Sequence, residues 1–549
     1  MATATVTKTT RKTTQNTEAY QVRFRRLADP GYFPALLYIY SGLAIPYLAW
    51  RTGIVNWHIW YGPMMYMADV YGIFTTILFL VIAQKAYKPV HRSMTPGKRI
   101  VDVLIPTYNE PLSVVEPTVL GALKVRGIRN VLLLDDGNRP EMRAMAQRLG
   151  IAYHPRTTNE HAKAGNMNNG LKYTDAELLM TLDADHIPLP EFLERTLGYF
   201  DDNGVAFVQT PQTYYNTESF LFRRRRGTVD WSEQVMFYDC IQPCKNRWNS
   251  SFFVGTSAVL RRAALDDVGG FATGTATEDI HTSLRLHARG WKSVFVPEAL
   301  AYGLEAASLA EFYKQRRRWS AGSLGLLFRS PDSPLRARGL SIGQRLNYIS
   351  ATLAHLQGVQ KLIYFVTPVL VITTLVGPVN IAYASFNLIF VAFTGLALWV
   401  THKYSRGTYH LLYTESYSLA NMMAHFGGIR GIIRVQKKFV VSRKTTARHE
   451  RSWLTPTMWA LLVLGLYGMA RSCWLLAGGN HSGLVLSALL FCTFNSMILL
   501  NFLVYLGLYE RNDPQLPVHA TLEPPAKYEH IAGSFGEAVL SEFALADEE

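Results

Sequence analysis

Long apolar stretches flank a large polar middle section of this chain. Apolar runs long enough to enter a bilayer, for which a helix needs roughly 20 residues, lie at about 33–50, 61–84, 362–379, 382–401, 456–476 and 483–508. The pattern predicts two membrane-spanning helices before the polar section and four after it.

The polar middle section follows a different periodicity. Short apolar runs that end in acidic or turn residues occur in RIVDVLIPTYNEP (99–111), VLLLDDGN (131–138) and LLMTLDADHIP (178–188), and helical patterns such as 141–149 separate them. Alternation of strands and helices predicts a mainly parallel sheet with helices on both faces. Ligands of such sheets bind at the carboxyl ends of the strands, where these acids stand.

Charge adds an orientation to this picture. The 549 residues carry a formal charge of +14, and basic residues concentrate in 1–31 and 402–452, whereas the tail after 508 is acidic. Basic clusters beside apolar spans are typical of cytoplasmic loops on an anionic leaflet. The sequence therefore predicts a multi-pass inner (plasma) membrane protein with the polar domain and both termini in the cytoplasm, with no cleavable signal peptide. No nucleic-acid-binding motif is recognisable, so no nucleic-acid partner is expected.

Two acidic pairs follow predicted strands. Asp183 and Asp185 form a D-x-D triplet, which can hold one Mg²⁺ together with phosphate oxygens; an isolated triplet of this kind is otherwise a solvated turn. Asp135 and Asp136 are placed to accept hydrogen bonds from a nucleobase or a ribose, although an Asp-Gly sequence is also a common turn.

Three further motifs carry candidate chemistry. In HAKAGNMNNG (161–170), Lys163 is placed to meet a diphosphate, the alternative being a plain polar loop. TATEDIHTSLRLH (275–287) reads as a capped helix start, but an acid at that point beside a cleft also suits proton abstraction from an acceptor hydroxyl. YKQRRRWSAG (313–322) is either a cytoplasmic membrane anchor or a site that grips phosphate and stacks a ring on a sugar.

Taken in order, these motifs resemble the processive family 2 glycosyltransferases of membranes, most closely bacterial cellulose synthase catalytic subunits. The likeness runs from about residue 30 to 508. It rests on the following residues: Asp135–Gly137, His161–Asn166, Asp183, Asp185, Gln209–Pro211, Phe252–Thr256, Thr277–Asp279, Gln315–Trp319, Phe439, Val441, Ser442 and Lys444.

The resemblance implies an α/β GT-A type (Rossmann-like) cytosolic domain, a UDP-sugar donor such as UDP-glucose, a divalent metal (Mg²⁺ or Mn²⁺) and an inverting transfer. Asp279 would be the general base. The implied metal ligands are Asp183 and Asp185. The other implied roles are donor binding by Asp135, Asp136, Lys163, Asp183, Gln315 and Arg318, acceptor binding by Trp319, Thr277, Glu278, Phe253 and Gly255, and a gating loop with Phe439, Val441, Ser442 and Lys444.

The expected activity is polymerisation of a β-glucan, cellulose first, with translocation of the growing polysaccharide across the membrane. β-1,3 or mixed-linkage glucan synthesis, single transfer to a lipid, and a non-catalytic scaffold or transporter remain open, as does an accessory or periplasmic subunit. Three features depart from the resemblance: six apparent spans instead of eight, no PilZ-like cyclic di-GMP domain, and Val254 where cellulose synthases often carry Cys.

These predictions divide the chain into five parts. They are a basic cytosolic tail (1–31), two helices (32–90), the GT-A domain (91–335), a section with interfacial helices, the gating loop within 402–452 and four spans (336–508), and an acidic tail expected to be disordered (509–549).

Overall fold

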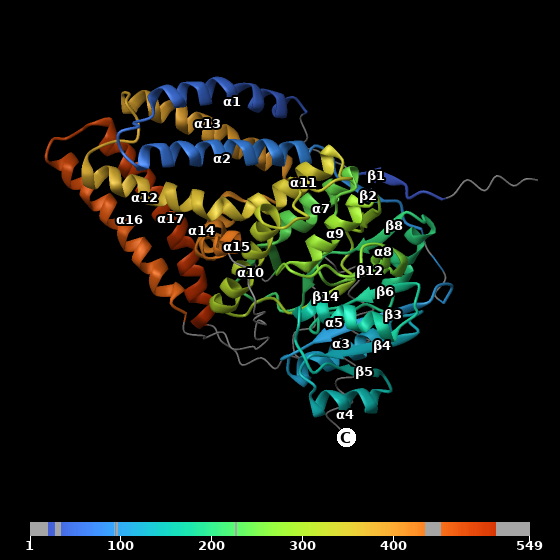
Figure 1. Cartoon of the computed structure of the whole chain (residues 1–549). Helices are drawn as coiled ribbons and strands as arrows, with labels where there is room; N and C mark the ends of the chain where they lie inside the picture. The colour runs from blue at the N-terminus through green and yellow to red at the C-terminus, as the bar shows by residue number, and fades with distance from the viewer. Residues whose placement is uncertain are drawn as a thin grey trace, which may run out of the picture.

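The computed structural model describes residues 20–27, 34–92, 94, 97–225, 228–433 and 452–511. Within these residues, a group of long helices packs against one side of an α/β domain, as Figure 1 shows. The predicted gating-loop residues Phe439, Val441, Ser442 and Lys444 lie outside the described residues, as do most of the N-terminal tail and nearly all of the acidic tail.

The α/β domain is built around a seven-stranded sheet with the order β13-β8-β12-β6-β3-β4-β5. Strand β12 runs antiparallel to both of its neighbours, and the other adjacent strands are parallel. The predicted mainly parallel sheet is therefore present, with one antiparallel strand that the alternation of elements did not indicate. The strands are β3 (Val101–Thr107), β4 (Asn130–Asp135), β5 (Ala152–Pro155), β6 (Leu178–Thr181), β8 (Val205–Gln209), β12 (Ala258–Arg261) and β13 (Lys292–Phe295).

Both faces of this sheet are covered, which explains why its strands read as continuous apolar runs. Val103 and Ile105 of β3 belong to a core with helices α3 (Leu112–Lys124) and α4 (Pro140–Leu149), whereas Leu104 between them packs with α5 (Ala162–Gly170) on the other face. All three side chains are 0% exposed. Truncating a side chain like Leu104 to Ala costs about 2–5 kcal/mol because the cavity left behind collapses only partly.

The boundaries of α4 follow from local chemistry. Pro140 occupies its first turn, where the missing N–H of proline is not needed, and Gly150 ends it in the left-handed region at φ 67°. The remaining helices of the domain are shorter or follow later in the chain: α6 (Phe192–Thr196), a π-helical turn (Met236–Ile241), α7 (Gln242–Lys245), α8 (Arg262–Asp267) and α9 (Glu278–Ala288).

Smaller sheets connect the domain to its surroundings. They are the three-stranded sheet β7-β14-β9 and the antiparallel pairs β1–β2 and β10–β11. Their bounds are β1 (Phe24–Arg26), β2 (Tyr87–Pro89), β7 (Ile187–Pro188), β9 (Thr213–Tyr214), β10 (Phe222–Arg225), β11 (Thr228–Ser232) and β14 (Ala301–Gly303).

Five helical segments among the described residues are long and apolar enough to cross a membrane. One of them joins α11 (Ile342–Leu353), a 3₁₀ turn (Ala354–Leu356) and α12 (Gln357–Thr374), so the span predicted at about 362–379 begins earlier in the chain than its apolar run. The other four are α2 (Tyr61–Ile82), α13 (Tyr383–Tyr404), α16 (Leu454–Ala477) and α17 (Gly483–Arg511).

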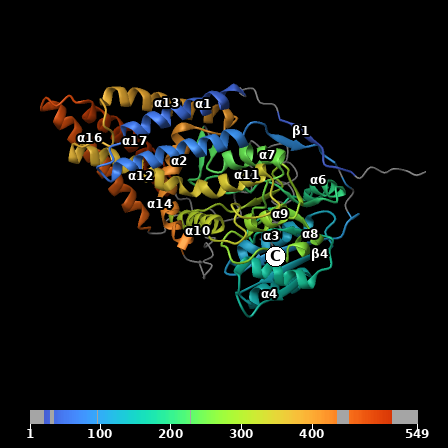
Figure 2. The same cartoon turned by 45° about the horizontal axis from the view of Figure 1, so that its top comes forward.

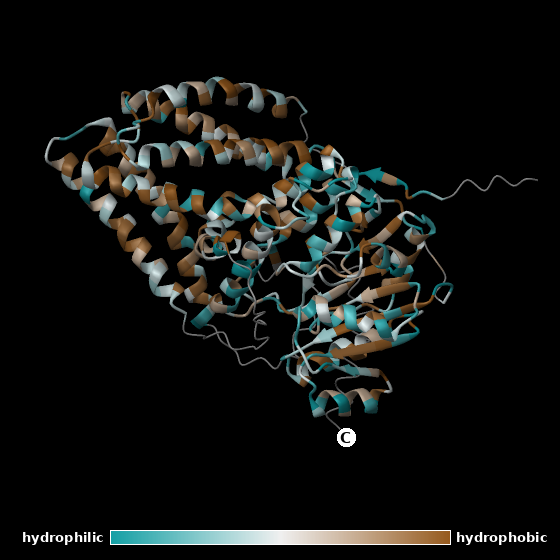
Figure 3. Cartoon of the chain, in the orientation of Figure 1, coloured by the Kyte–Doolittle hydropathy of each residue, from teal (hydrophilic) through white to brown (hydrophobic). Residues whose placement is uncertain are grey.

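The remaining predicted span, at about 33–50, corresponds to α1 (Ala35–Ile54), which is helical, contains Pro46 and Arg51, and is not among these five segments. It nevertheless lies beside α2 and α13 in both views (Figures 1 and 2). The apolar residues gather on these helices, whereas hydrophilic residues cover much of the α/β domain (Figure 3).

Asp69, the acid predicted inside the second span, joins three helices. Its carboxylate pairs with the Arg51 guanidinium of α1 at 2.7 Å and accepts a hydrogen bond from the Tyr364 hydroxyl of α12 at 2.7 Å. Asp69 and Arg51 are both buried. The Asp69 carboxylate therefore links α2 to two neighbouring helices.

Helix α10 (Leu309–Phe328) attaches the α/β domain to the long helices. It contacts α14 (Leu411–Gly428) and α15 (Arg430–Ile433), and its Phe312 shares a core with Phe220, Tyr417 of α14 and Phe502 of α17. Ser308 caps its first turn by accepting from the Glu311 backbone N–H at 3.3 Å. The YKQRRRW motif therefore lies at the junction between the domain and the helices.

Candidate active site

A cavity of about 450 Å³ lies where the sheet, α9 and α10 meet. The carboxyl ends of β4 and β6 reach it from the two sides of β3, which pairs with both strands, and ligands of open α/β sheets bind at such a switch point. The cavity brings together ten residues predicted from the sequence: Asp136, Lys163, Asp183, Asp185, Thr277, Glu278, Asp279, Gln315, Arg318 and Trp319.

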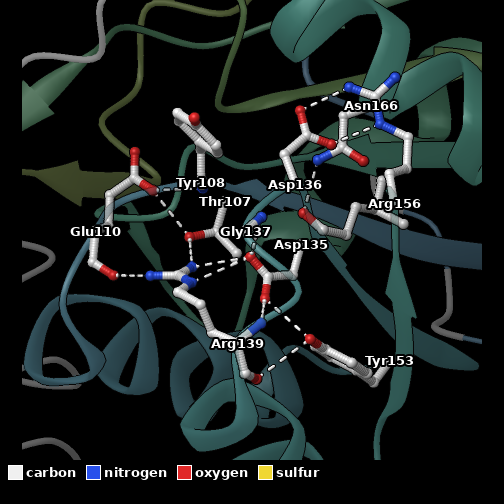
Figure 4. A network of polar contacts seen from close by, with 11 residues as sticks. Thr107, Tyr108, Glu110, Asp135, Asp136, Gly137, Arg139, Tyr153, Arg156 and Asn166 are labelled. Atoms are coloured by element: carbon white, nitrogen blue, oxygen red, sulfur yellow. Dashed lines mark hydrogen bonds and ion pairs between the residues drawn. The ribbon is translucent and has the colours of Figure 1, made fainter. Parts of the chain in front are cut away.

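The two acids after β4 differ in their surroundings (Figure 4). Asp135 is 0% exposed, and its carboxylate accepts from the backbone N–H groups of Gly137 (2.9 Å) and Arg139 (2.7 Å) and from the Tyr153 hydroxyl (2.9 Å). It therefore fixes the turn after β4 and does not line the cavity. Its neighbour Asp136 does line it.

Asp136 is held by an arginine from the next strand. Nε and Nη2 of Arg156 each donate to one of its carboxylate oxygens at 2.6 Å. Burial raises the pKa of Asp136 above its ordinary value, although the hydrogen bonds from Arg156 oppose the rise. Asp136 is thus a positioned acceptor at the cavity wall.

Lys163 stands in the first turn of α5 and joins three segments. Its Nζ donates to Asp183 Oδ1 at 2.5 Å and to the Gly255 carbonyl at 2.8 Å, and Glu278 Oε1 lies 3.9 Å away. Burial alone would lower the pKa of Lys163, but the charges of Asp183 and Glu278 outweigh it and raise the pKa. Lys163 therefore remains a cation inside the cavity.

Gly255 is required by this contact. Its φ is +91°, a region that other residues rarely adopt, and a Cβ there would lie 3.0 Å from Lys163 Nζ. Phe253, which was also predicted to bind the acceptor, does not line the cavity, because it is buried against Phe207 and Phe271 in the domain core. Gly255 thus contributes a carbonyl to Lys163, and Phe253 contributes packing.

Gln209 explains why the Q-T-P and F-F-V-G-T motifs occur together. Its side-chain Nε2 donates to the carbonyls of Thr210 (2.7 Å) and Thr256 (2.9 Å), and its Oε1 accepts from the Val254 N–H at 3.0 Å. The Gln209 amide is buried, and both its nitrogen and its oxygen are hydrogen-bonded, so it holds the Q-T-P and F-F-V-G-T segments together.

The D-x-D acids form a candidate metal centre with a residue that the sequence analysis did not single out. Ligand atoms of Asp183, Asp185 and His186 all lie within 4.8 Å of one another. Leu304 N–H donates to Asp185 Oδ2 at 3.0 Å, which fixes that carboxylate, and the buried His186 Nε2 has no hydrogen-bond partner among the described residues. The two carboxylates suit Mg²⁺ or Mn²⁺, and the imidazole, a ligand typical of transition metals, makes the whole set fit Mn²⁺ better than Mg²⁺. His186 follows the triplet directly in DADH, and that adjacency was the available signal.

Asp279 lies in the first turn of α9 and lines the cavity. Burial, followed by the charge of Glu278, raises the pKa of Asp279 to about 7, while the Ile280 N–H, Lys163 and Arg318 oppose the rise. Thr277 is the N-cap residue, but its side chain makes no capping hydrogen bond. A carboxylate with such a pKa is matched to proton abstraction near neutral pH.

Helix α10 supplies the remaining wall through Gln315, Arg318 and Trp319. Arg316 also lines the cavity: its Cζ is 4.2 Å from the Trp319 ring centroid, and its Nη2 donates to Glu233 at 2.5 Å. Gly322 lets the start of α9 approach, because a Cβ there would lie 2.7 Å from Thr277. The cationic side chains suit a phosphorylated ligand, and the Trp319 ring suits a flat-faced one.

Comparison with known proteins defines the class. Residues 178–400 match the family described as Glycosyl transferase family group 2. This section of the chain, which runs from β6 to α13, is therefore similar to family 2 glycosyltransferases and includes helices apolar enough to cross a membrane. The resemblance and the fold class predicted from the motifs are confirmed.

The curated relatives are bacterial. The chain is 40% identical over 352 residues to "Cellulose synthase 1" of Komagataeibacter xylinus, covering 60% of this chain and 22% of the relative. It is 42% identical over 267 residues to the UDP-forming "Cellulose synthase catalytic subunit" of Xanthomonas axonopodis pv. citri, covering 48% of this chain and 36% of the relative. The chain thus spans less than half of the length of these relatives.

Among solved structures, the mannosyltransferase PcManGT from Pyrobaculum calidifontis in complex with GDP-Man and Mn²⁺ is similar. It is 15% identical, with a TM-score of 0.48, and the match covers 68% of this chain and 99% of that one.

Proposed function

We propose that this chain is a processive, inverting glycosyltransferase that polymerises a β-glucan, cellulose first, from UDP-glucose and passes the product through its helices. One observation carries the proposal: Asp279, the acidic cation site and Trp319 line a single cavity. The names of the relatives, cellulose synthases described as UDP-forming, support UDP-glucose as the donor.

The side chains suit an in-line displacement. Asp279 would take the proton of an acceptor hydroxyl, whose oxygen forms a bond to the anomeric carbon while the bond from that carbon to the UDP oxygen breaks. UDP leaves with the bonding electrons, and the anomeric configuration inverts. The cations Lys163 and Arg318 would offset the charge that builds on the leaving diphosphate.

Asp183, Asp185 and His186 would hold the divalent cation. When bound there, Mg²⁺ or Mn²⁺ would act as a Lewis acid toward diphosphate oxygens. Asp136 is placed to bind the nucleoside part of the donor, and Asp135 would act by holding the turn that carries Asp136.

A route for the product is available between the helices. A second cavity of about 540 Å³ is lined by aromatic and polar side chains that include Tyr364, Tyr409 and Gln360. It shares the lining residues Phe79, Ile241, Ser350 and Ala354 with the first cavity. Such a lining can stack on sugar faces and hydrogen-bond hydroxyls, which a polar polymer needs inside a bilayer.

The same arrangement implies an orientation. The α/β domain would face the cytoplasm of a cell with its nucleotide-sugar pool, the chain would lie in the inner membrane, and both termini would be cytoplasmic, as the basic section 402–452 suggests. Membrane lipid and the growing polysaccharide would be its partners, and whether an accessory or periplasmic subunit joins them stays open.

The test is UDP release by the purified full chain in lipid nanodiscs with UDP-glucose, UDP-N-acetylglucosamine and GDP-mannose in parallel, followed by linkage and length analysis. A ladder or insoluble β-1,4-glucan from UDP-glucose supports the proposal. A product with β-1,3 or mixed linkages would show instead that the chain is a glucan synthase of that linkage. A single lipid-soluble product would show that it is a lipid glycosyltransferase. No nucleotide release from any donor, with Asp279→Asn indistinguishable from the unchanged chain, would favour a non-catalytic scaffold.

A further inference from the structure

Lys245 is a buried lysine in the wall of the catalytic cavity to which the transfer reaction gives no role. It is the last residue of α7, is 2% exposed, and lines the cavity. Its Nζ lies 4.0 Å from the centroid of the Phe252 ring. Among the described residues, its ammonium has no salt bridge and no hydrogen bond.

This situation is energetically unfavourable without a ligand. Removing a charged amine from water costs several kcal/mol unless it is paired, and buried polar groups in native structures usually have a partner. Burial lowers the pKa of Lys245 to about 7, and no carboxylate of the described residues opposes the shift. The charge of Lys245 acts on His287, whose ring nitrogens are already engaged by the Tyr348 hydroxyl (2.7 Å) and Ser293 Oγ (2.9 Å).

Lys245 lies near the place where the catalytic cavity meets the cavity between the helices. Ile241, which lines both the catalytic cavity and the cavity between the helices, stands four residues earlier on the same continuous helical segment. Phe79, Ser350 and Ala354 also line both cavities. Lys245 therefore belongs to the end of the catalytic cavity that adjoins the helices, whereas the charges of Asp183, Glu278 and Asp279 act on Lys163.

We propose that Lys245 binds the acceptor chain, with its amine hydrogen-bonded to hydroxyls of the sugar unit that leaves the transfer site for the inter-helix cavity. The inference rests on the proposed function and assigns a further acceptor subsite to it. A neutral amine has two N–H donors and one lone pair, which matches hydroxyls that both donate and accept. The Phe252 ring beside it offers an apolar surface for a sugar face.

The first test uses the unchanged full chain in nanodiscs and does not depend on turnover. Reductive methylation at pH 7.5, read by mass spectrometry, follows Lys245 with and without a β-1,4-linked glucan hexasaccharide, and the exposed Lys172 serves as the internal reference. We expect the hexasaccharide to slow the labelling of Lys245 at least fivefold and to leave Lys172 unchanged. Equal labelling, or protection by UDP-glucose alone, overturns the inference.

The second test compares Lys245→Met with Lys172→Met as the matched control. Methionine keeps the length and burial of the side chain, so we expect an unchanged or higher melting temperature together with at least tenfold weaker hexasaccharide binding and unchanged UDP binding. Hexasaccharide binding equal to that of the unchanged chain overturns the inference. Absence of any binding to the unchanged chain also overturns it, while UDP release decides the proposed function separately.

Discussion

The guanidinium of Arg316 covers the indole ring of Trp319, with its Cζ 4.2 Å from the ring centroid, and at the same time donates to Glu233 at 2.5 Å. Arg316 is buried, and the Glu233 side chain is 13% exposed. Asn421 of α14 donates to the other oxygen of Glu233 at 3.1 Å. The position of Trp319 in the cavity is therefore linked to the helices through two charged groups.

We expect Glu233→Ala to destabilise the chain by about 3–5 kcal/mol, because Arg316 then keeps a buried charge without its partner. The orientation of Trp319 should also loosen, which raises the KM for an oligosaccharide acceptor more than that for UDP-glucose. Glu194→Ala is the control: in its pair with Arg126 the arginine is 52% and the glutamate 32% exposed, so the loss should stay below about 1 kcal/mol. Equal effects of the two substitutions would contradict the account.

Asp279→Asn should lower UDP release by about 10²–10⁴-fold, the usual contribution of a general base. Asparagine preserves the shape of the side chain, so binding of UDP should stay within about twofold, since Asp279 does not have to carry a charge for that step. Single-turnover measurements separate the two. Loss of UDP binding together with turnover would instead give Asp279 a role in holding the donor.

The pH dependence of turnover should follow the pKa of Asp279, which is raised to about 7. The base acts only when it is deprotonated, so kcat/KM should level off above pH 7 and fall about tenfold for each pH unit below it. A profile that stays flat down to pH 5 would contradict the assignment.

The same pKa has a consequence for stability. An acid whose pKa is higher in the folded state than in the unfolded chain destabilises the fold progressively as the pH rises from about 4 to 7, because the folded state resists ionisation. Asp279→Asn removes this effect. Its melting temperature should therefore exceed that of the unchanged chain at pH 8, and the two should converge as the pH falls toward 4.

Removal of divalent cations with a chelator should abolish UDP release, and Mg²⁺ or Mn²⁺ should restore it. Asp185→Asn and His186→Ala should each raise the metal concentration needed for half-maximal rate by about tenfold or more, since each removes one of three ligands. Asp175→Asn, which changes an acid paired with Arg129 on the surface, should leave the metal dependence unchanged. A metal requirement untouched by His186→Ala would limit the ligand set to the two aspartates.

Asp69→Asn should destabilise the packing of α1 against α2 by about 3–5 kcal/mol, because Arg51 then lacks its charged partner in a buried position. The double variant Arg51→Met with Asp69→Leu should recover most of the loss, since no unpaired charge remains. Thermal unfolding in nanodiscs distinguishes the two. A double variant as unstable as Asp69→Asn would mean that the pair is needed for more than charge balance.

The motifs in the sequence predicted most of the candidate site because each consists of residues next to one another in the chain. DADH, HAKAGN and TED could be recognised without knowing what surrounds them, and the structure brings Lys163, Asp183 and Asp279 to one cavity. Asp135 and Asp136 could not be told apart in this way. Which of two adjacent acids satisfies the turn and which faces the cavity depends on Tyr153 and Arg156 of the next strand.

The order of apolar and polar residues was sufficient to predict the fold class, an α/β sheet covered on both faces and flanked in the chain by long helices. This is because burial of one or both faces of an element sets the period of its apolar residues. Only the tertiary structure determines which polar groups around the catalytic cavity are bonded to other segments and which have no partner. Gln209 and Gly255 acquire their roles from segments dozens of residues away, and Lys245 is isolated because no acid in the described part of the chain pairs with it. Such contacts depend on distances in space, which cannot be read from the spacing of residues along the chain.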